Sequence, residues 1–142
     1  MGIPVVQGEA ILELLPQREP MVMVDSFYGI ADGCSYSGLA VLASNIFCDG
    51  CYLQETGVIE HIAQSAAARV GYLCSQSKQP VPLGFIGAVD KLSIYRLPAV
   101  GDCLRTEIRI VQEVMNITLA EASVSINGEC IAECKLKIVL DS

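Results

Sequence analysis

A helix predicted for residues 56–75 restricts the fold of this chain more than any other feature, because it is the single long helix and carries many small side chains. Thr56 is a suitable N-cap, and alanine, the strongest helix former, recurs along the segment at positions 63, 66, 67 and 68. Such small side chains let a helix lie close to the backbone around it. Because most of the remaining chain is typical of strands and loops, we expect the helix to pack against a sheet.

Strands are predicted on both sides of this helix. Before it, residues 10–15 predict a short apolar helical turn that ends at Pro16, and strands are expected at 21–24 and 34–42. After it, four strands are expected, at 84–95, 103–111, 117–126 and 129–139. Asn127-Gly128 is a strong hairpin signal, and tight turns imply antiparallel pairing. We predict an α+β fold, a single domain over residues 1–142, in which an antiparallel sheet wraps one long helix.

The composition limits the partners that this chain can have. Hydrophobic residues make up 52% of the 142 residues and charged residues only 18%, so we expect a second subunit to cover part of the surface. The net charge of -7 and the lack of a basic run argue against nucleic-acid binding. No segment predicts a membrane span, and no basic segment followed by an apolar one opens the chain. We therefore expect a soluble, cytoplasmic protein that binds no membrane.

The seven cysteines favour reduced thiols, because their number is odd and no signal peptide is predicted. Cys48 and Cys51 form a C-x-x-C in the loop over residues 45–55. A zinc site needs about four ligands, and no second pair has suitable spacing. We therefore expect no metal and no other cofactor. Asp49 in the same loop could act as a base, but an Asp-Gly turn explains it equally well.

The central helix carries a polar pair, Glu60 and the only histidine, His61, in an apolar stretch. A charge there is costly unless it is paired or used. Gln64 follows Glu60 by four positions and can orient its carboxylate from the same helix face. The alternative is that Glu60 only favours the positive end of the helix dipole. His61 lies about 100° around the helix from Glu60, so both a catalytic and a structural role stay open for it.

Three blocks of sequence have a family resemblance in their order and spacing. Residues 15–25 contain Leu-Pro-Gln-Arg-Glu-Pro, and residues 60–64 are Glu-His-Ile-Ala-Gln. Residues 84–102 contain the strand expected at 84–95 and end in Gly-Asp. They resemble the β-hydroxyacyl-(acyl carrier protein) dehydratases, which have the hot-dog fold. The loop at 49–52 lacks the histidine of that family, and Gln17 also stands in place of a histidine. A divergent branch with a shortened loop, the dehydratase-like proteins of aryl-polyene-type clusters, resembles the chain more closely.

The resemblance implies a hot-dog fold and a lyase activity. The substrate would be a 3-hydroxyacyl thioester of acyl carrier protein or coenzyme A, in fatty-acid or polyene-type synthesis. In the family, the acid is a helix carboxylate and the base is the loop histidine of another subunit. Glu60 is the counterpart of the carboxylate, and His61 is the second catalytic candidate. Gly57, Val58 and Gln64 are candidates for substrate binding, the first two through backbone N–H groups near the helix start.

Two further functions stay open at this point. The chain can be a non-catalytic hot-dog subunit that pairs with an active paralogue, because the loop histidine is missing. It can also be an acyl thioesterase, since related hot-dog enzymes use a helix carboxylate to activate water. In each case we expect a homodimer, or a heterodimer with another hot-dog subunit.

Overall fold

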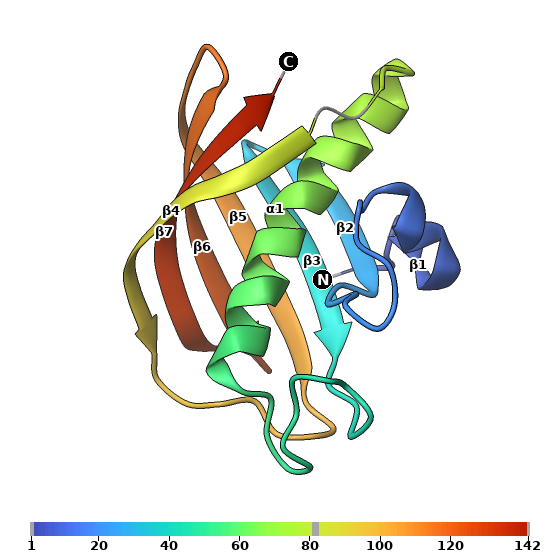
Figure 1. The fold of residues 1–142 in the computed structure, drawn as a ribbon, viewed down its shortest axis with the longest axis vertical. Coiled ribbons are helices and arrows are strands. Elements are labelled where there is room, and N and C mark those ends of the chain that lie inside the picture. Colours follow the sequence, from blue (N-terminus) through green and yellow to red (C-terminus); the bar gives the residue numbers. More distant parts are fainter. Residues whose placement is uncertain (1, 81–82, 142) are drawn as a thin grey trace.

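The computed structural model describes residues 2–80 and 83–141, and within them seven strands form one antiparallel sheet that wraps around one long helix (Figure 1). The strands lie in the order β1-β2-β3-β5-β6-β7-β4. The elements in chain order are β1 (Val6–Gln7), the 3-10 helix η1 (Gly8–Glu13), β2 (Ser26–Ala31), β3 (Cys34–Ala40), α1 (Glu55–Ser77), β4 (Leu83–Ile94), β5 (Cys103–Val114), β6 (Ile117–Ile126) and β7 (Glu129–Asp141). The predicted α+β architecture is confirmed.

The core lies between α1 and the concave face of the sheet. Val58 and Ile62 of α1 pack with the inward side chains of β5, β6 and β7, among them Leu104, Val124 and Leu136. β6 buries every second residue along its length, and β5 does so at Leu104, Thr106 and Ile108, as their alternating sequences predict. A second cluster lies under η1, where Ile11, Leu14, Leu15, Val24, Phe27 and Ala68 pack together.

The small residues of α1 allow backbone segments to approach the helix closely. A Cβ atom on Gly71 would lie 2.1 Å from the carbonyl oxygen of Leu14. That atom belongs to the backbone at the end of η1, which cannot rotate away as a side chain would. The expected close packing of α1 against surrounding backbone is therefore confirmed at this contact.

Two local predictions are wrong. Residues 21–24 are buried in part but form no strand, because their polar backbone groups bond to side chains of α1 instead of a neighbouring strand. The strand in this region is β2, which pairs with β3 through the Asp32-Gly33 turn. At the helix start, Gln54 precedes the first turn without a side-chain cap, so Thr56 is not the N-cap. None of the helices in the described ranges is long and apolar enough to cross a membrane.

Candidate active site

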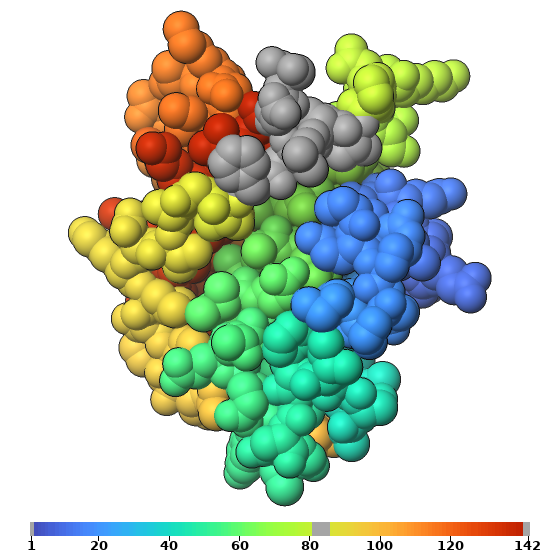
Figure 2. All heavy atoms as spheres, in the orientation of Figure 1, coloured from blue at the N-terminus to red at the C-terminus, as the bar shows by residue number. Residues whose placement is uncertain are grey.

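Glu60 lies beside an apolar cavity between α1 and the strands β4 and β7. The cavity has a volume of about 240 Å³. Its walls come from Ile59, Glu60, Ile62 and Ala63 of α1, Ile86, Val89 and Leu92 of β4, and Cys134 and Leu136 of β7. Figure 2 shows this side of the molecule, with the green surface of α1 between β4 in yellow and the N-terminal segment in blue. Among the described residues of this wall, Glu60 is therefore the one carboxylate, and its neighbours are apolar or, at Cys134, a thiol.

Gln64 holds this carboxylate in place. Its Nε2 atom donates hydrogen bonds to Oε2 of Glu60 and to the carbonyl oxygen of Met21, both at 2.7 Å. Its Oε1 atom accepts a hydrogen bond from the backbone N–H of Met23, also at 2.7 Å. The amide orientation is fixed because the Met23 N–H requires an acceptor and the Met21 carbonyl requires a donor. The predicted contact between Gln64 and Glu60 is confirmed, and Gln64 itself is completely buried.

His61 points away from this cavity into the core. Its Nδ1 atom lies 2.6 Å from the carbonyl oxygen of Met23, and its Nε2 atom lies 2.8 Å from Oγ1 of Thr106. A carbonyl can only accept, so Nδ1 carries the proton, and the neutral ring accepts the Thr106 hydroxyl hydrogen at Nε2. Burial lowers the pKa of His61 to about 4, against the opposing effects of the Met23 carbonyl and the Asp25 charge. A catalytic role for His61 stays a prediction, and these contacts are those of a structural histidine.

The backbone donors expected at the start of α1 are already used. The N–H groups of Gly57 and Val58 both donate to the carbonyl oxygen of Gln54, at 2.9 and 3.1 Å. The prediction that these two groups are free to bind a substrate is therefore wrong in this structure. The physical reason is that the N-cap is Gln54 instead of Thr56, two residues earlier than expected, which moves Gly57 and Val58 into the first hydrogen-bonded turn of the helix.

Gly57 has a packing role instead. A Cβ atom there would lie 2.6 Å from Cδ1 of Leu53 and 2.7 Å from Cβ of Phe47. The loop before α1 therefore rests directly on this glycine.

The loop before α1 contains no second base of the kind found in the family. Asp49 accepts hydrogen bonds from the N–H groups of Tyr52 and Cys51 at 2.8 and 2.9 Å, and these bonds lower the pKa of its carboxyl. This is the turn role that its Asp-Gly sequence predicts. Burial raises the pKa of the Cys48 thiol, so this thiol is a poor nucleophile. Among the described residues, no group of three His, Cys, Asp or Glu side chains is arranged to hold a metal ion.

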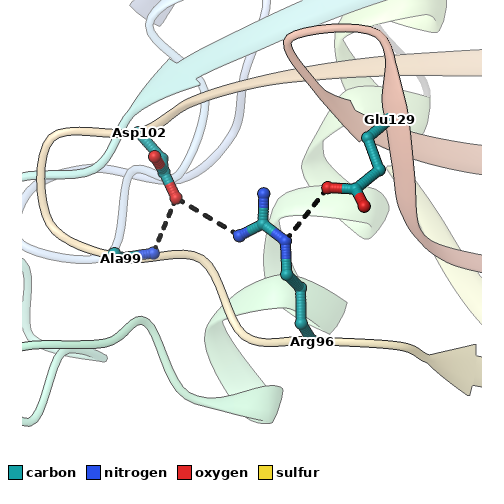
Figure 3. A network of polar contacts seen from close by, with 4 residues as sticks. All are labelled: Arg96, Ala99, Asp102 and Glu129. Carbon is teal, nitrogen blue, oxygen red and sulfur yellow. Dashed lines mark hydrogen bonds and ion pairs between the residues drawn. The ribbon is translucent and has the colours of Figure 1, made fainter.

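Asp102 has a structural role, as its place after Gly101 predicts. Its Oδ2 atom accepts the backbone N–H of Ala99 at 2.9 Å and lies 3.6 Å from Nη1 of Arg96 (Figure 3). Nε of Arg96 lies 3.2 Å from Oε1 of Glu129. This network fixes the connection between β4 and β5, and it leaves Arg96 engaged with two carboxylates of its own chain.

Two parts of the site are not predicted from the sequence. Thr106 is completely buried, and the backbone of Met21 and Met23 supplies three of the contacts around Gln64 and His61. A signal for Thr106 was present, because it is the polar residue on the inward face of β5 between Leu104 and Ile108. No signal marked the backbone groups, since any residue offers the same donor and acceptor.

Fold and site together define a hot-dog protein with a helix carboxylate at an apolar cavity. The chain belongs to the ApeP-like family, whose model, described as ApeP dehydratase, matches residues 9–141. This confirms the predicted resemblance to the aryl-polyene branch and the dehydratase-like function.

Curated relatives and solved structures agree with this assignment. A 3-hydroxyacyl-[acyl-carrier-protein] dehydratase FabZ from Clostridium botulinum is 25% identical over 133 residues, which cover 92% of each chain. FabZ from Halorhodospira halophila is 29% identical over 140 residues, with 91% of this chain and 88% of the relative covered.

Among solved structures, a chain of the dehydratase heterocomplex ApeI:P from Xenorhabdus doucetiae superposes with a TM-score of 0.85 at 17% identity, over 100% of this chain and 93% of that one. The uncharacterised protein PH1136 from Pyrococcus horikoshii gives a TM-score of 0.69 at 15% identity, with 99% and 96% covered. At these identities the structures establish the hot-dog fold.

Proposed function

We propose that Glu60 is the proton-transfer carboxylate in the removal of water from a 3-hydroxyacyl thioester. The observation that carries this proposal is the position of Glu60 on the wall of an apolar cavity, where Gln64 holds one carboxylate oxygen. An apolar cavity suits an acyl chain, and a carboxylate on its wall can exchange a proton with the hydroxyl group near the thioester. The FabZ relatives, named for 3-hydroxyacyl-[acyl-carrier-protein] substrates, support this substrate class.

The reaction needs two proton transfers. A base removes a proton from C2, and the released electron pair forms the C2=C3 double bond. The C3–O bond breaks, and an acid protonates the departing hydroxyl so that it leaves as water. No atom is oxidised or reduced by an outside reagent. We assign the acid step to Glu60, since the helix carboxylate has this role in the family that the chain resembles.

The base is expected from another subunit. Besides Glu60, the described residues that line the cavity include one titratable group, Cys134, and burial raises the pKa of its thiol to about 11. That thiol stays protonated near neutral pH and cannot accept the C2 proton. His61 faces Met23 and Thr106 on the other side of α1. The chain alone therefore presents half of an acid–base pair.

The second subunit is proposed to pair along β4. In the described part of the chain this strand bonds to β7 on one side only, so it forms an edge of the sheet. Unpaired edges are surfaces for strand pairing between chains. Val89 and Leu92 of β4 line the cavity and remain 37% and 36% exposed. The ApeI:P heterocomplex supports a different hot-dog protein as the partner, and a second copy of this chain is the alternative.

Gln64 is proposed to act on the substrate only through Glu60, because its amide donors and its acceptor are all engaged by protein groups. Gln54, the N-cap residue of α1, makes no side-chain hydrogen bond to the first turn. Thr56 in this turn lies four residues before Glu60, on the same helix face. Its backbone N–H is the better candidate for polarising the thioester carbonyl, in place of Gly57 and Val58.

The proposal is tested with a 3-hydroxyoctanoyl thioester of N-acetylcysteamine, by following the absorbance of the conjugated enoyl product. The protein is assayed alone and with a candidate hot-dog partner. We expect Glu60→Gln to lower kcat by roughly a hundredfold or more, because the amide cannot exchange the proton. Glu13→Gln changes an exposed carboxylate of η1 and should have no effect. Dehydration that persists in Glu60→Gln would contradict the assignment. If it persists only with the partner present, the role left for this chain is that of a supporting subunit.

A further inference from the structure

We propose that His61 is a positioning residue, which fixes the orientation of the Glu60 carboxylate through the backbone of Met23 and the side chain of Gln64. This inference rests on the proposed role of Glu60 and adds a residue that does not touch the cavity. His61 is the one histidine of the chain and is next to Glu60 in the sequence, but its ring points away from the Glu60 carboxylate and bonds to Thr106. The positioning role gives this buried histidine a function.

The contacts form a continuous chain from the sheet to the cavity. The hydroxyl group of Thr106 in β5 donates a hydrogen bond to Nε2 of the imidazole at 2.8 Å. Nδ1 of the imidazole donates to the carbonyl oxygen of Met23 at 2.6 Å. The backbone N–H of Met23 donates to Oε1 of Gln64 at 2.7 Å. Nε2 of Gln64 donates to Oε2 of Glu60, also at 2.7 Å. Each link is a hydrogen bond between groups in or near the core, where such bonds are strong.

The backbone of Met23 links His61 to Gln64, because its carbonyl bonds to the imidazole and its N–H bonds to the Gln64 amide. Residues 21–24 belong to no strand, so no ladder of backbone hydrogen bonds fixes them from the sheet. They are fixed instead from α1, by His61 at the Met23 carbonyl and by Gln64 at the Met23 N–H and the Met21 carbonyl. If the imidazole is removed, a buried carbonyl loses its partner and the segment must shift to satisfy it. That shift moves the Met23 N–H and the Met21 carbonyl, the two backbone groups that orient the Gln64 amide.

A matched pair of substitutions separates positioning from simple space filling. In His61→Asn the amide nitrogen can take the place of Nδ1 and donate to Met23, whereas in His61→Gln the amide reaches toward the place of Nε2 and Thr106. We expect His61→Asn to retain most of kcat. We expect His61→Gln to lose roughly tenfold to a hundredfold in kcat, with KM changed much less, because displacement of a catalytic group by about 1 Å has an effect of this size.

A double-mutant cycle with Gln64→Ala tests the route of the effect. If His61 acts through Gln64, then His61→Gln should lower kcat by less than about twofold once Gln64 has been removed. Equal losses in the two backgrounds would overturn the proposal. Ile131→Val, a core substitution in β7, controls for lowered stability and should leave kcat unchanged. Where His61 variants do not fold, Thr106→Val takes their place in the same cycle, with a smaller loss expected because Nδ1 keeps its contact.

A crystal structure of His61→Gln gives a readout that does not depend on activity. We expect the hydrogen bond between Gln64 and Glu60 to be broken or lengthened, and an unchanged bond would overturn the positioning role. If Glu60→Gln abolishes dehydration while the His61 variants do not affect it, the positioning role alone fails. If Glu60→Gln has no effect, the proposed function fails, and the crystal structure still decides whether His61 positions the carboxylate.

Discussion

At the scale of single residues, neighbours in the sequence have opposite environments. Glu60 borders a cavity, whereas His61 is completely buried with both ring nitrogens engaged. The rotation of about 100° per helical residue causes this separation. Gln64 lies between the two directions, so it can bond to Glu60 on one side and to the Met23 backbone on the other. A single helical turn therefore joins the cavity wall to the core.

The buried His61 should make the protein sensitive to acid. Its folded-state pKa of about 4 lies below the ordinary value of 6.5, so between these values the unfolded chain binds a proton that the folded chain does not. This contribution to stability is complete above pH 6.5 and is lost as the pH falls toward 4. The loss from this one group is on the order of 3 kcal/mol. Urea unfolding at pH 7 and at pH 4.5 measures it.

The effect of His61 is separated from every other effect of pH on stability by comparing two proteins. His61→Asn removes the titrating ring and keeps a donor for the Met23 carbonyl. The decrease in unfolding free energy between pH 7 and pH 4.5 should be clearly smaller in this variant than in the parent protein. An identical decrease in both proteins would show that His61 does not set the acid sensitivity.

At the scale of elements, α1 is held to the N-terminal segment by backbone contact at Gly71. Gly71→Ala would place its Cβ 2.1 Å from the Leu14 carbonyl oxygen, and η1 would have to move away. Alanine normally stabilises a helix interior by about 1 kcal/mol relative to glycine, but overpacking at this contact outweighs that gain. We expect a loss of about 2–3 kcal/mol in unfolding free energy, measured by urea denaturation. Gln76→Ala, at an exposed position of α1, should change it by less than about 0.5 kcal/mol. A Gly71→Ala protein as stable as the parent would contradict this contact.

The sequence predicts those elements whose signals are local. The alternation in β5, the Asn127-Gly128 hairpin and the alanine-rich α1 all lie where the pattern indicates. Residues 21–24 are the counterexample, because an apolar run shows that a segment is buried but not which groups satisfy its backbone. β2 was missed because its sequence, Ser-Phe-Tyr-Gly-Ile-Ala, follows that stronger apolar run directly.

In the candidate site, too, contacts between sequence neighbours are predictable and contacts between distant residues are not. The bond between Glu60 and Gln64 follows from helical spacing and is predictable from the sequence. The partners of His61 lie 38 and 45 positions away, so a fold is needed to bring them together. The prediction of free N–H groups at Gly57 and Val58 is wrong because a shift of two residues in the N-cap changes which groups are bonded.

At the scale of the whole molecule, the proposed site depends on the proposed assembly. The cavity beside Glu60 is bounded on one side by the edge strand β4, and besides Glu60 its described lining contains one titratable group, the Cys134 thiol, which burial keeps protonated near neutral pH. A partner that pairs with β4 would lie next to this cavity and could complete it. Loss of pairing should therefore abolish dehydration even where the fold of each chain is intact.

A double substitution in β4 tests this coupling of assembly and activity. Val89→Glu with Leu92→Glu places two charges on apolar side chains of the edge strand that line the cavity. We expect the dissociation constant of the dimer to rise at least about tenfold, which corresponds to about 1.4 kcal/mol and is modest for two lost apolar contacts. Sedimentation measures the assembly, and circular dichroism shows whether each chain remains folded.

Activity measured over a range of protein concentrations then decides whether Glu60 needs a partner. Specific activity should fall when the parent protein is diluted below its dissociation constant, and in the β4 variant it should fall at a higher concentration. Val114→Glu is the matched control, since Val114 is 53% exposed near the β5–β6 turn and does not line the cavity. It should leave both assembly and activity unchanged. Full specific activity in a monomeric β4 variant would contradict a two-subunit site, because one chain would then provide both the acid and the base.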